Sequence, residues 1–279
     1  MFQGWPSNPA KARDLLVQPM NLLIVGRDKT DAILEHLSGQ FLLLDDGPII
    51  DEWLLRNTRK STELDFTKHS FNPLSRMDSK RARDFISILD AIFPEGENTL
   101  TKKNSNHVLL KALREKPRNF LHLLTKLTPP KASDTAYVDA YQKIENLLLS
   151  DVLEHVFTNP TNFSSRGVLL ARLDRAELSE FVCRVLGLFL VAGYKGQVVI
   201  PDFGFYGARH HTALMREDRL IAGVNWLDEI PDLRHSLLLI DDKIGRHTTA
   251  EDAEALAEYT GLVPNTNAHS EFVQRAIQG

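Results

Sequence analysis

The sequence is poor in cysteine and contains no long apolar run. Its single cysteine, Cys183, excludes an internal disulfide. It lies in an apolar stretch, which favours a buried structural thiol over a catalytic one. No apolar run approaches the roughly 20 residues of a membrane-spanning helix, and the first residues lack the basic and apolar regions of a leader peptide. We therefore expect a cytoplasmic protein without membrane contact.

The sequence also has no large excess of positive or negative charge. The formal net charge is −4 and the pI is about 6.2, which argues against a surface coated in basic residues for non-specific nucleic-acid binding but leaves room for a local basic patch. The ten histidines are scattered apart from the pair in Arg209-His210-His211. Adjacent residues of a strand face opposite ways and no third ligand stands nearby, so we expect no metal site.

Apolar segments and helical periodicity alternate along the 279 residues, which predicts a parallel α/β sheet. The expected strands are at 20–26, 40–47, 61–66, 167–173, 197–202, 219–225 and 235–240. The expected helices are at 29–38, 49–56, 78–93, 104–127 with a break at Pro117, 134–149, 175–192 with Asp174 as its N-cap, and 250–260. Residues 1–19 then form an N-terminal arm, residues 20–262 one domain with a helical insertion at about 78–160, and residues 263–279 a tail.

The stretch from Met20 to Leu34 predicts a buried strand, a turn with one glycine and a helix start. A phosphate-binding loop has the form G-x-x-x-x-G-K-[ST], whose backbone N–H groups surround the phosphates. Here Gly26 stands only three positions before Lys29, and Thr30 follows. Either Lys29 is a solvated residue of the first helical turn and Thr30 an ordinary helix-start residue, or the two bind a nucleotide weakly with the free N–H groups of the helix.

Two later strands also end in polar residues. Pro201, Asp202 and Phe203 follow the strand at 197–202, where Asp202 is either a turn residue or a former catalytic acid, and Asn225 ends the next strand. Ligands of open α/β sheets bind at the carboxyl ends of the strands.

The order of these segments resembles the HerA/FtsK branch of P-loop ATPases, nearest to the coupling proteins of conjugation systems and to DNA-packaging ATPases. The resemblance covers about residues 20–262 and implies a RecA-like, doubly wound, mostly parallel sheet with a helical insertion. It matches Gly26, Lys29 and Thr30 to the residues that hold the phosphates and Mg²⁺.

The resemblance also assigns roles to the later residues. In one register Pro201 stands at the metal-holding Asp and Asp202 at the catalytic Glu; in the other, Asp202 holds the metal and Phe203 replaces the base. In both registers, either the metal-holding acid or the catalytic acid is absent. Asn225 matches a Gln that senses the γ-phosphate or positions water. Arg216 and Arg219 stand where an arginine reaches a neighbouring subunit.

Losses in both the loop and the acidic strand favour a pseudo-ATPase, because phosphoryl transfer depends on positioning and charge stabilisation. We expect no cofactor, or ATP with Mg²⁺ if the site is still competent. The favoured function is a non-hydrolysing subunit of a DNA-handling assembly for translocation, conjugation, phages or mobile elements, in a ring of its own or with an active relative. The alternatives are a working DNA-translocating or packaging ATPase and an inhibitor of a related ring.

The densest basic stretch lies on the helical insertion, and it contains Lys102, Lys103, Lys111, Arg114, Lys116 and Arg118. It is either a solvated helix face or a contact to nucleic-acid phosphates, in which Lys111, Arg114 and Arg118 are the candidate residues.

Overall fold

The computed structural model describes residues 21–25, 29–94, 99–131, 133–206, 220–225 and 236–240. The expected arm at 1–19, the helix at 250–260 and the tail at 263–279 lie outside these ranges. The described chain forms two compact units. The first is drawn from the residues up to 60 and from 196 onward, and the second consists of residues 61–195.

Five strands form the sheet of the first unit, in the order β2-β5-β6-β1-β7 with every pair parallel. β2 and β6 are buried along their whole length, which is typical of a parallel sheet covered on both faces. All five predicted strands are confirmed. Their bounds are Asn21–Val25 for β1, Phe41–Asp45 for β2, Gln197–Ile200 for β5, Leu220–Val224 for β6 and Ser236–Ile240 for β7.

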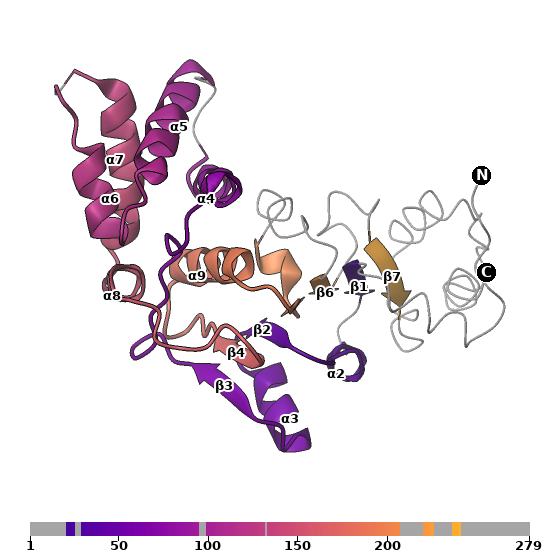
Figure 1. Ribbon diagram of the computed structural model, residues 1–279. Coiled ribbons are helices and arrows are strands. Elements are labelled where there is room, and N and C mark those ends of the chain that lie inside the picture. The colour runs from indigo at the N-terminus through magenta and orange to yellow at the C-terminus, as the bar shows by residue number, and fades with distance from the viewer. Residues whose placement is uncertain are drawn as a thin grey trace, which may run out of the picture. The chain divides into compact units, whose positions relative to one another are not determined.

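Helices α2 (Thr30–Glu35) and α3 (Pro48–Arg56) follow β1 and β2 (Figure 1). The ring of Trp53 in α3 packs edge to face on Phe41 of β2, with centroids 5.6 Å apart. An exposed ion pair of 2.7 Å joins Arg56 to Asp31 of α2, and at this exposure it adds little stability. The helix α3 is therefore held mainly by its buried face, which consists of Ile49, Ile50 and Trp53.

The turn from β2 to α3 is organised by Asp45. Its buried carboxylate oxygen Oδ2 accepts hydrogen bonds from the backbone N–H groups of Gly47, Ile49 and Ile50, at 3.0, 2.8 and 3.1 Å. These groups lie at the helix start, where N–H donors lack intrahelical acceptors. Burial raises the pKa of Asp45, against the opposing effect of the three N–H donors. This strand-end acid is thus a helix cap.

We expect Asp45→Ala to lower the free energy of unfolding by about 2–3 kcal/mol, because three N–H groups lose their acceptor. Asp45→Asn should cost less, because the amide oxygen still accepts. Since the pKa of Asp45 is raised by folding, its stabilisation is complete below about pH 4 and is lost as the pH rises through the folded-state pKa. Urea unfolding between pH 4 and 7 should therefore show the wild type losing stability relative to Asp45→Asn. Equal losses for Ala and Asn would contradict the capping role.

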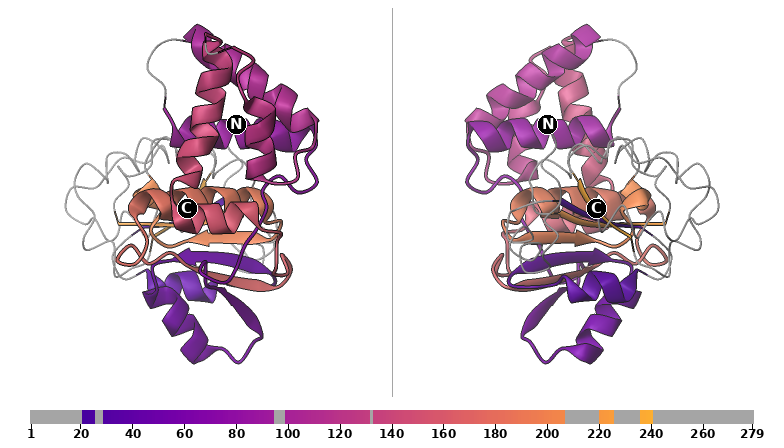
Figure 2. Two further views of the ribbon diagram at one scale, coloured as in Figure 1. Left: turned by 90° about the vertical axis from the view of Figure 1, so that its left-hand side faces the viewer. Right: turned by 90° about the vertical axis from the view of Figure 1, so that its right-hand side faces the viewer.

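The second unit contains the parallel strands β3 (Ser61–Leu64) and β4 (Val168–Arg172), and within its described residues six helices. Figures 1 and 2 show α4 to α7 side by side as a bundle. The predicted strands, the predicted helices apart from the start of α9, and the break at Pro117 are confirmed, whereas α8 was not predicted separately. None of the described helices is long and apolar enough to cross a membrane. The helices are α4 (Ser79–Ile92), α5 (Thr99–Arg114), α6 (Phe120–Leu127), α7 (Thr135–Leu148), α8 (Asp151–Thr158) and α9 (Glu180–Gly193).

Phenylalanine rings form a central cluster of this unit. The fully buried ring of Phe120 in α6 stacks on Phe157 of α8 with centroids 4.8 Å apart. Phe85 of α4 and Phe189 of α9 lie 5.7 and 6.2 Å from Phe120. Four helices that are distant in the sequence are therefore joined at one side chain.

The predicted start of one helix is wrong. α9 begins at Glu180 rather than at 175, and its N-cap is Ser179, whose Oγ accepts a hydrogen bond from the N–H of Val182 at 3.3 Å. Asp174 instead closes a short turn by accepting from the N–H of Ala176 at 2.8 Å. Serine and aspartate are equally good N-caps, so the sequence offers two starts.

Candidate functional site

Three neighbouring strands of the first unit bring the predicted site residues to one edge of the sheet. β5, β6 and β1 are adjacent in the strand order. Lys29, Asn225 and Asp202 follow the carboxyl ends of β1, β6 and β5, respectively. Because the strands are parallel, these three ends lie at the same edge, where ligands bind in open α/β sheets.

Lys29 is buried, with 8% of its surface exposed. It is the N-cap residue of α2, and its carbonyl oxygen accepts the N–H of Ile33 at 2.9 Å. Its ammonium group donates a hydrogen bond to Oδ1 of Asn225 at 2.8 Å, which meets the need of a buried charge for a polar partner. The interpretation of Lys29 as a solvated lysine is therefore wrong, and two of the predicted site residues are in contact.

Gly223 in β6 makes room for the lysine side chain. A Cβ atom at this position would lie 2.3 Å from the carbonyl oxygen of Pro201 and 2.9 Å from Cδ and Cε of Lys29. Any larger residue would push the lysine or the turn after β5 out of place. Sequence reasoning did not assign Gly223 a role, although a glycine inside an apolar strand is a signal of close backbone approach.

The turn after β5 separates Asp202 from its neighbour Phe203. Asp202 is half-buried, whereas Phe203 is fully buried in the short 3₁₀ helix η1 (Phe203–Tyr206). The N–H of Phe205 donates to the carbonyl oxygen of Asp202 at 3.3 Å and fixes this turn. Phe203 is thus a packing residue, and Asp202 is the carboxylate that follows β5. Thr30, the first residue of α2, is half-buried.

Other predicted residues of this site lie outside the described ranges. They are Gly26, Arg216 and Arg219. The segment Arg209-His210-His211, where no metal site was expected, also lies outside these ranges. In the part of the chain that the structure describes, no three His, Cys, Asp or Glu side chains are grouped as metal ligands.

Cys183 is a buried thiol in α9, as predicted. Burial raises its pKa to about 11, so the reactive thiolate is scarce at neutral pH.

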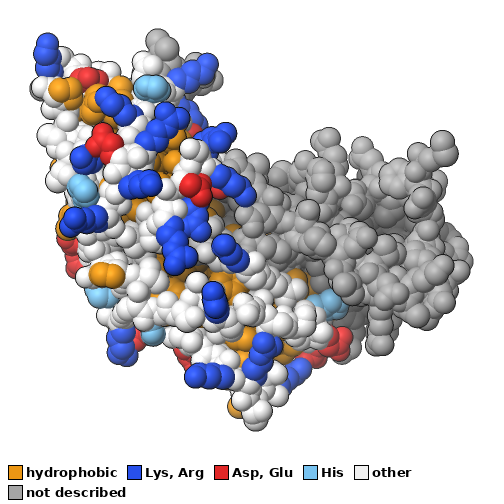
Figure 3. Space-filling view, viewed as in Figure 1, with side chains coloured by type: hydrophobic (Ala, Val, Ile, Leu, Met, Phe, Trp, Pro, Cys, Tyr) orange, Lys and Arg blue, Asp and Glu red, His pale blue; other side chains and the backbone are white. Residues whose placement is uncertain are grey.

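The predicted nucleic-acid contacts belong to the second unit and are all exposed. Lys111 and Arg114 share one face of the last turn of α5, and Arg118 follows this helix. Figure 3 shows Lys and Arg side chains gathered over the viewed face of the helices. Residues 71–131 carry twelve Lys or Arg and six Asp or Glu, in a protein whose formal net charge is −4. Positive charge is therefore concentrated in this segment.

The fold matches the structure of VirB4 of Thermoanaerobacter pseudethanolicus with a TM-score of 0.60 and 11% identity, over 89% of this chain and 84% of that one. The plasmid coupling protein TrwB with the GTP analogue GDPNP aligns over 95% of this chain and 69% of that one, with a TM-score of 0.47 and 11% identity. No family model and no curated protein matches the sequence. The VirB4 match confirms the predicted RecA-like α/β fold.

Proposed function

We propose that this protein is a pseudo-ATPase that serves as a structural or regulatory subunit of a DNA-handling assembly, such as a conjugation, translocation, phage or mobile-element machine. It assembles as a ring, alone or with an active relative. The fold is that of an ATPase, but the residues that would act on a nucleotide are incomplete.

The contact between Lys29 and Asn225 is the observation that carries this proposal. In a working site the lysine amine reaches the β- and γ-phosphates, and catalysis depends on its position. Here the amine is buried and bonded to the residue that follows β6, and the chain over Gly26–Thr30 has fewer N–H groups than a complete loop. Asp202 stands without the second acid that phosphoryl transfer requires.

A working ATPase is the second candidate, and one observation favours it. Lys29 still lies at the start of the helix after β1, at the same edge of the sheet as Asp202 and Asn225. If a nucleotide displaced Asn225 from the amine, Lys29 and Thr30 would bind phosphate. A neighbour's Arg216 or Arg219 would then complete the site.

ATP hydrolysis with Mg²⁺, with and without DNA, separates the two candidates. We expect no activity of the wild type above that of Lys29→Met or Thr30→Val, and weak or no ATP binding in calorimetry. Lys60→Met, at an exposed lysine of the same unit, is the matched control. The pseudo-ATPase proposal would be overturned if the wild type and Lys60→Met hydrolysed ATP and Lys29→Met and Thr30→Val did not. Circular dichroism would have to show that the variants are folded.

Sedimentation of the purified protein tests the ring. We expect a particle whose mass is a multiple of 31.5 kDa. If the protein were a monomer at all concentrations, a homomeric ring would be excluded, and only a mixed ring with another subunit would remain.

A further inference from the structure

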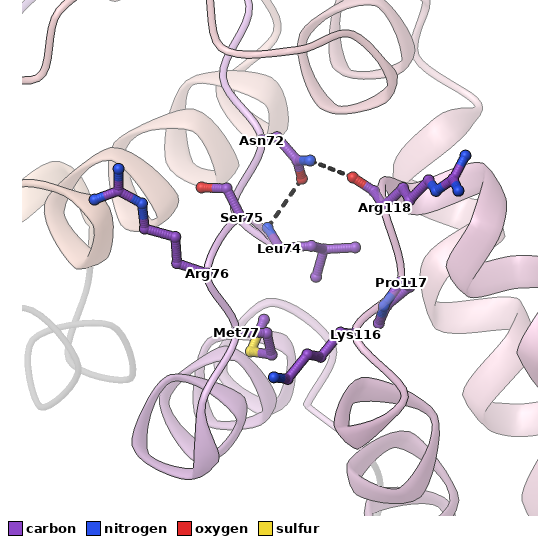
Figure 4. A pocket seen from close by; sticks show the side chains of 8 residues that line it. All are labelled: Asn72, Leu74, Ser75, Arg76, Met77, Lys116, Pro117 and Arg118. Carbon is purple, nitrogen blue, oxygen red and sulfur yellow. Dashed lines mark hydrogen bonds between the residues drawn. The ribbon is translucent and has the colours of Figure 1, made fainter.

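The second unit has a cavity of about 530 Å³ between the turn that precedes α4 and the turn that follows α5 (Figure 4). Three apolar residues that line it, Leu74, Met77 and Pro117, are buried. Three basic residues surround it. Arg76 belongs to the turn before α4, and Lys116 and Arg118 belong to the turn after α5. The cavity thus combines an apolar floor with a cationic rim.

Arg76 and Lys116 both have a left-handed backbone, with φ angles of 56° and 52°. A residue other than glycine is strained in this conformation, because its Cβ atom lies too close to the following carbonyl oxygen. Lys116 stands just after α5, where its N–H donates to the carbonyl oxygen of Leu113 at 3.0 Å and where glycine is the usual residue. Both positions therefore carry a cation where glycine would give a more stable fold, and unfavourable backbone of this kind is typical of binding sites.

Asn72 connects the two turns. Its side-chain N–H donates to the carbonyl oxygen of Arg118, and its Oδ1 accepts from the N–H of Leu74 at 3.0 Å. In Figure 4 the Lys116 side chain runs across the cavity toward Met77, whereas Arg76 and Arg118 point outward on opposite sides. Charges spread in this way suit an extended polyanion better than a single phosphate ion.

We propose that this cavity binds a single strand of nucleic acid. The sugar or base of one nucleotide rests on Leu74, Met77 and Pro117, and the flanking phosphates contact Arg76, Lys116 and Arg118. A duplex fits less well, because its bases are stacked inside. The choice of nucleic acid over an acidic protein rests on the proposed function, but the binding does not depend on the nucleotide site, which belongs to the other unit.

The test is a titration of a fluorescent single-stranded oligonucleotide of about 20 nucleotides, followed by anisotropy over a range of salt concentrations. The double variant Arg76→Gly/Lys116→Gly should be at least as stable as the wild type, because glycine relieves the left-handed backbone. It should bind at least about tenfold more weakly at low salt, and the slope of log K against log salt should shrink by about 1.4, for two lost phosphate contacts. Arg118→Gln should weaken binding further.

Lys131→Ser/Arg166→Ser removes two exposed charges outside the cavity and is the matched control. We expect it to change the affinity by less than about threefold. Equal losses in the two double variants, or none in the glycine variant, would overturn the proposal. Equally tight binding of a duplex or of polyglutamate through Arg76 and Lys116 would also overturn it. The ATPase assays of Lys29 variants give a separate answer, so the two proposals fail independently.

Discussion

Replacing Phe120 by alanine is expected to lower the free energy of unfolding by about 3–5 kcal/mol. The ring is fully buried and lies within 4.8 to 6.2 Å of Phe157, Phe85 and Phe189, which belong to three other helices. Its removal costs the transfer free energy of the ring and leaves a cavity that three fixed aromatic neighbours cannot easily fill. Urea denaturation followed by far-UV circular dichroism measures the loss.

Leu121 provides the matched control, because it is the next residue of α6 and 47% exposed. Leu121→Ala removes a large apolar side chain from the same helix, but the expected change is within about 1 kcal/mol, since little buried surface is lost. Phe120→Leu should fall between the two. A loss for Phe120→Ala no greater than that for Leu121→Ala would show that the aromatic cluster does not hold the helices together.

Most of the strands were predicted correctly because parallel strands that are buried on both faces consist of continuous apolar residues. The strand β3 is an exception, since only Leu64 of its four residues is buried. The run at 197–200 and the run at 220–224 need no tertiary information to be recognised. The helices were recognised for a similar reason, since their buried side chains recur at helical spacing. Helix starts were harder to predict, as Asp174 and Ser179 show, because both residue types can cap a helix and in the structure only Ser179 caps α9.

The site was predicted as a set of strand ends, but not as a set of contacts. Lys29 and Asn225 are 196 residues apart, and their hydrogen bond depends on the strand order that puts β6 beside β1. Local periodicity carries no information on that order. Gly223 was missed for the same reason, because its role is defined by Lys29 and Pro201. The sequence was enough to predict individual site residues, whereas the contacts between them could be seen only in the folded structure.

The structure also shows that buried polar residues have different roles in the two units. In the first unit, Lys29 and Asp45 are bonded at strand ends, where the backbone must turn. In the second, Lys143 lies in the interior of the helical bundle, on α7. Its side chain is 5% exposed and reaches Oδ2 of Asp139 at 3.5 Å, Oδ1 of Asp90 at 3.9 Å and Oγ of Ser105 at 3.4 Å. These contacts join α7 to α4 and α5.

Lys143→Met is expected to lower the free energy of unfolding by about 2–3 kcal/mol, because Asp139 loses its cation and Asp90 keeps only the ion pair with Lys102, at 3.4 Å. Asp90 Oδ1 and Asp139 Oδ2 accept no hydrogen bond, so the ammonium charge is what offsets their burial. Adding Asp139→Asn to Lys143→Met removes the negative charge nearest to the lost ammonium group and should recover at least about 1 kcal/mol. Chemical denaturation of the single and double variants at one pH measures both values.

Lys126→Met is the control for this prediction. Lys126 makes a shorter ion pair, of 2.8 Å with Glu115, but both side chains are partly exposed. In water the charge of Glu115 remains solvated after the lysine is lost, so the expected cost is within about 1 kcal/mol. If Lys143→Met cost no more than Lys126→Met, burial would not be what makes the Lys143 contacts matter. If Asp139→Asn failed to restore stability to Lys143→Met, the loss would come from packing of the lysine stem and not from its charge.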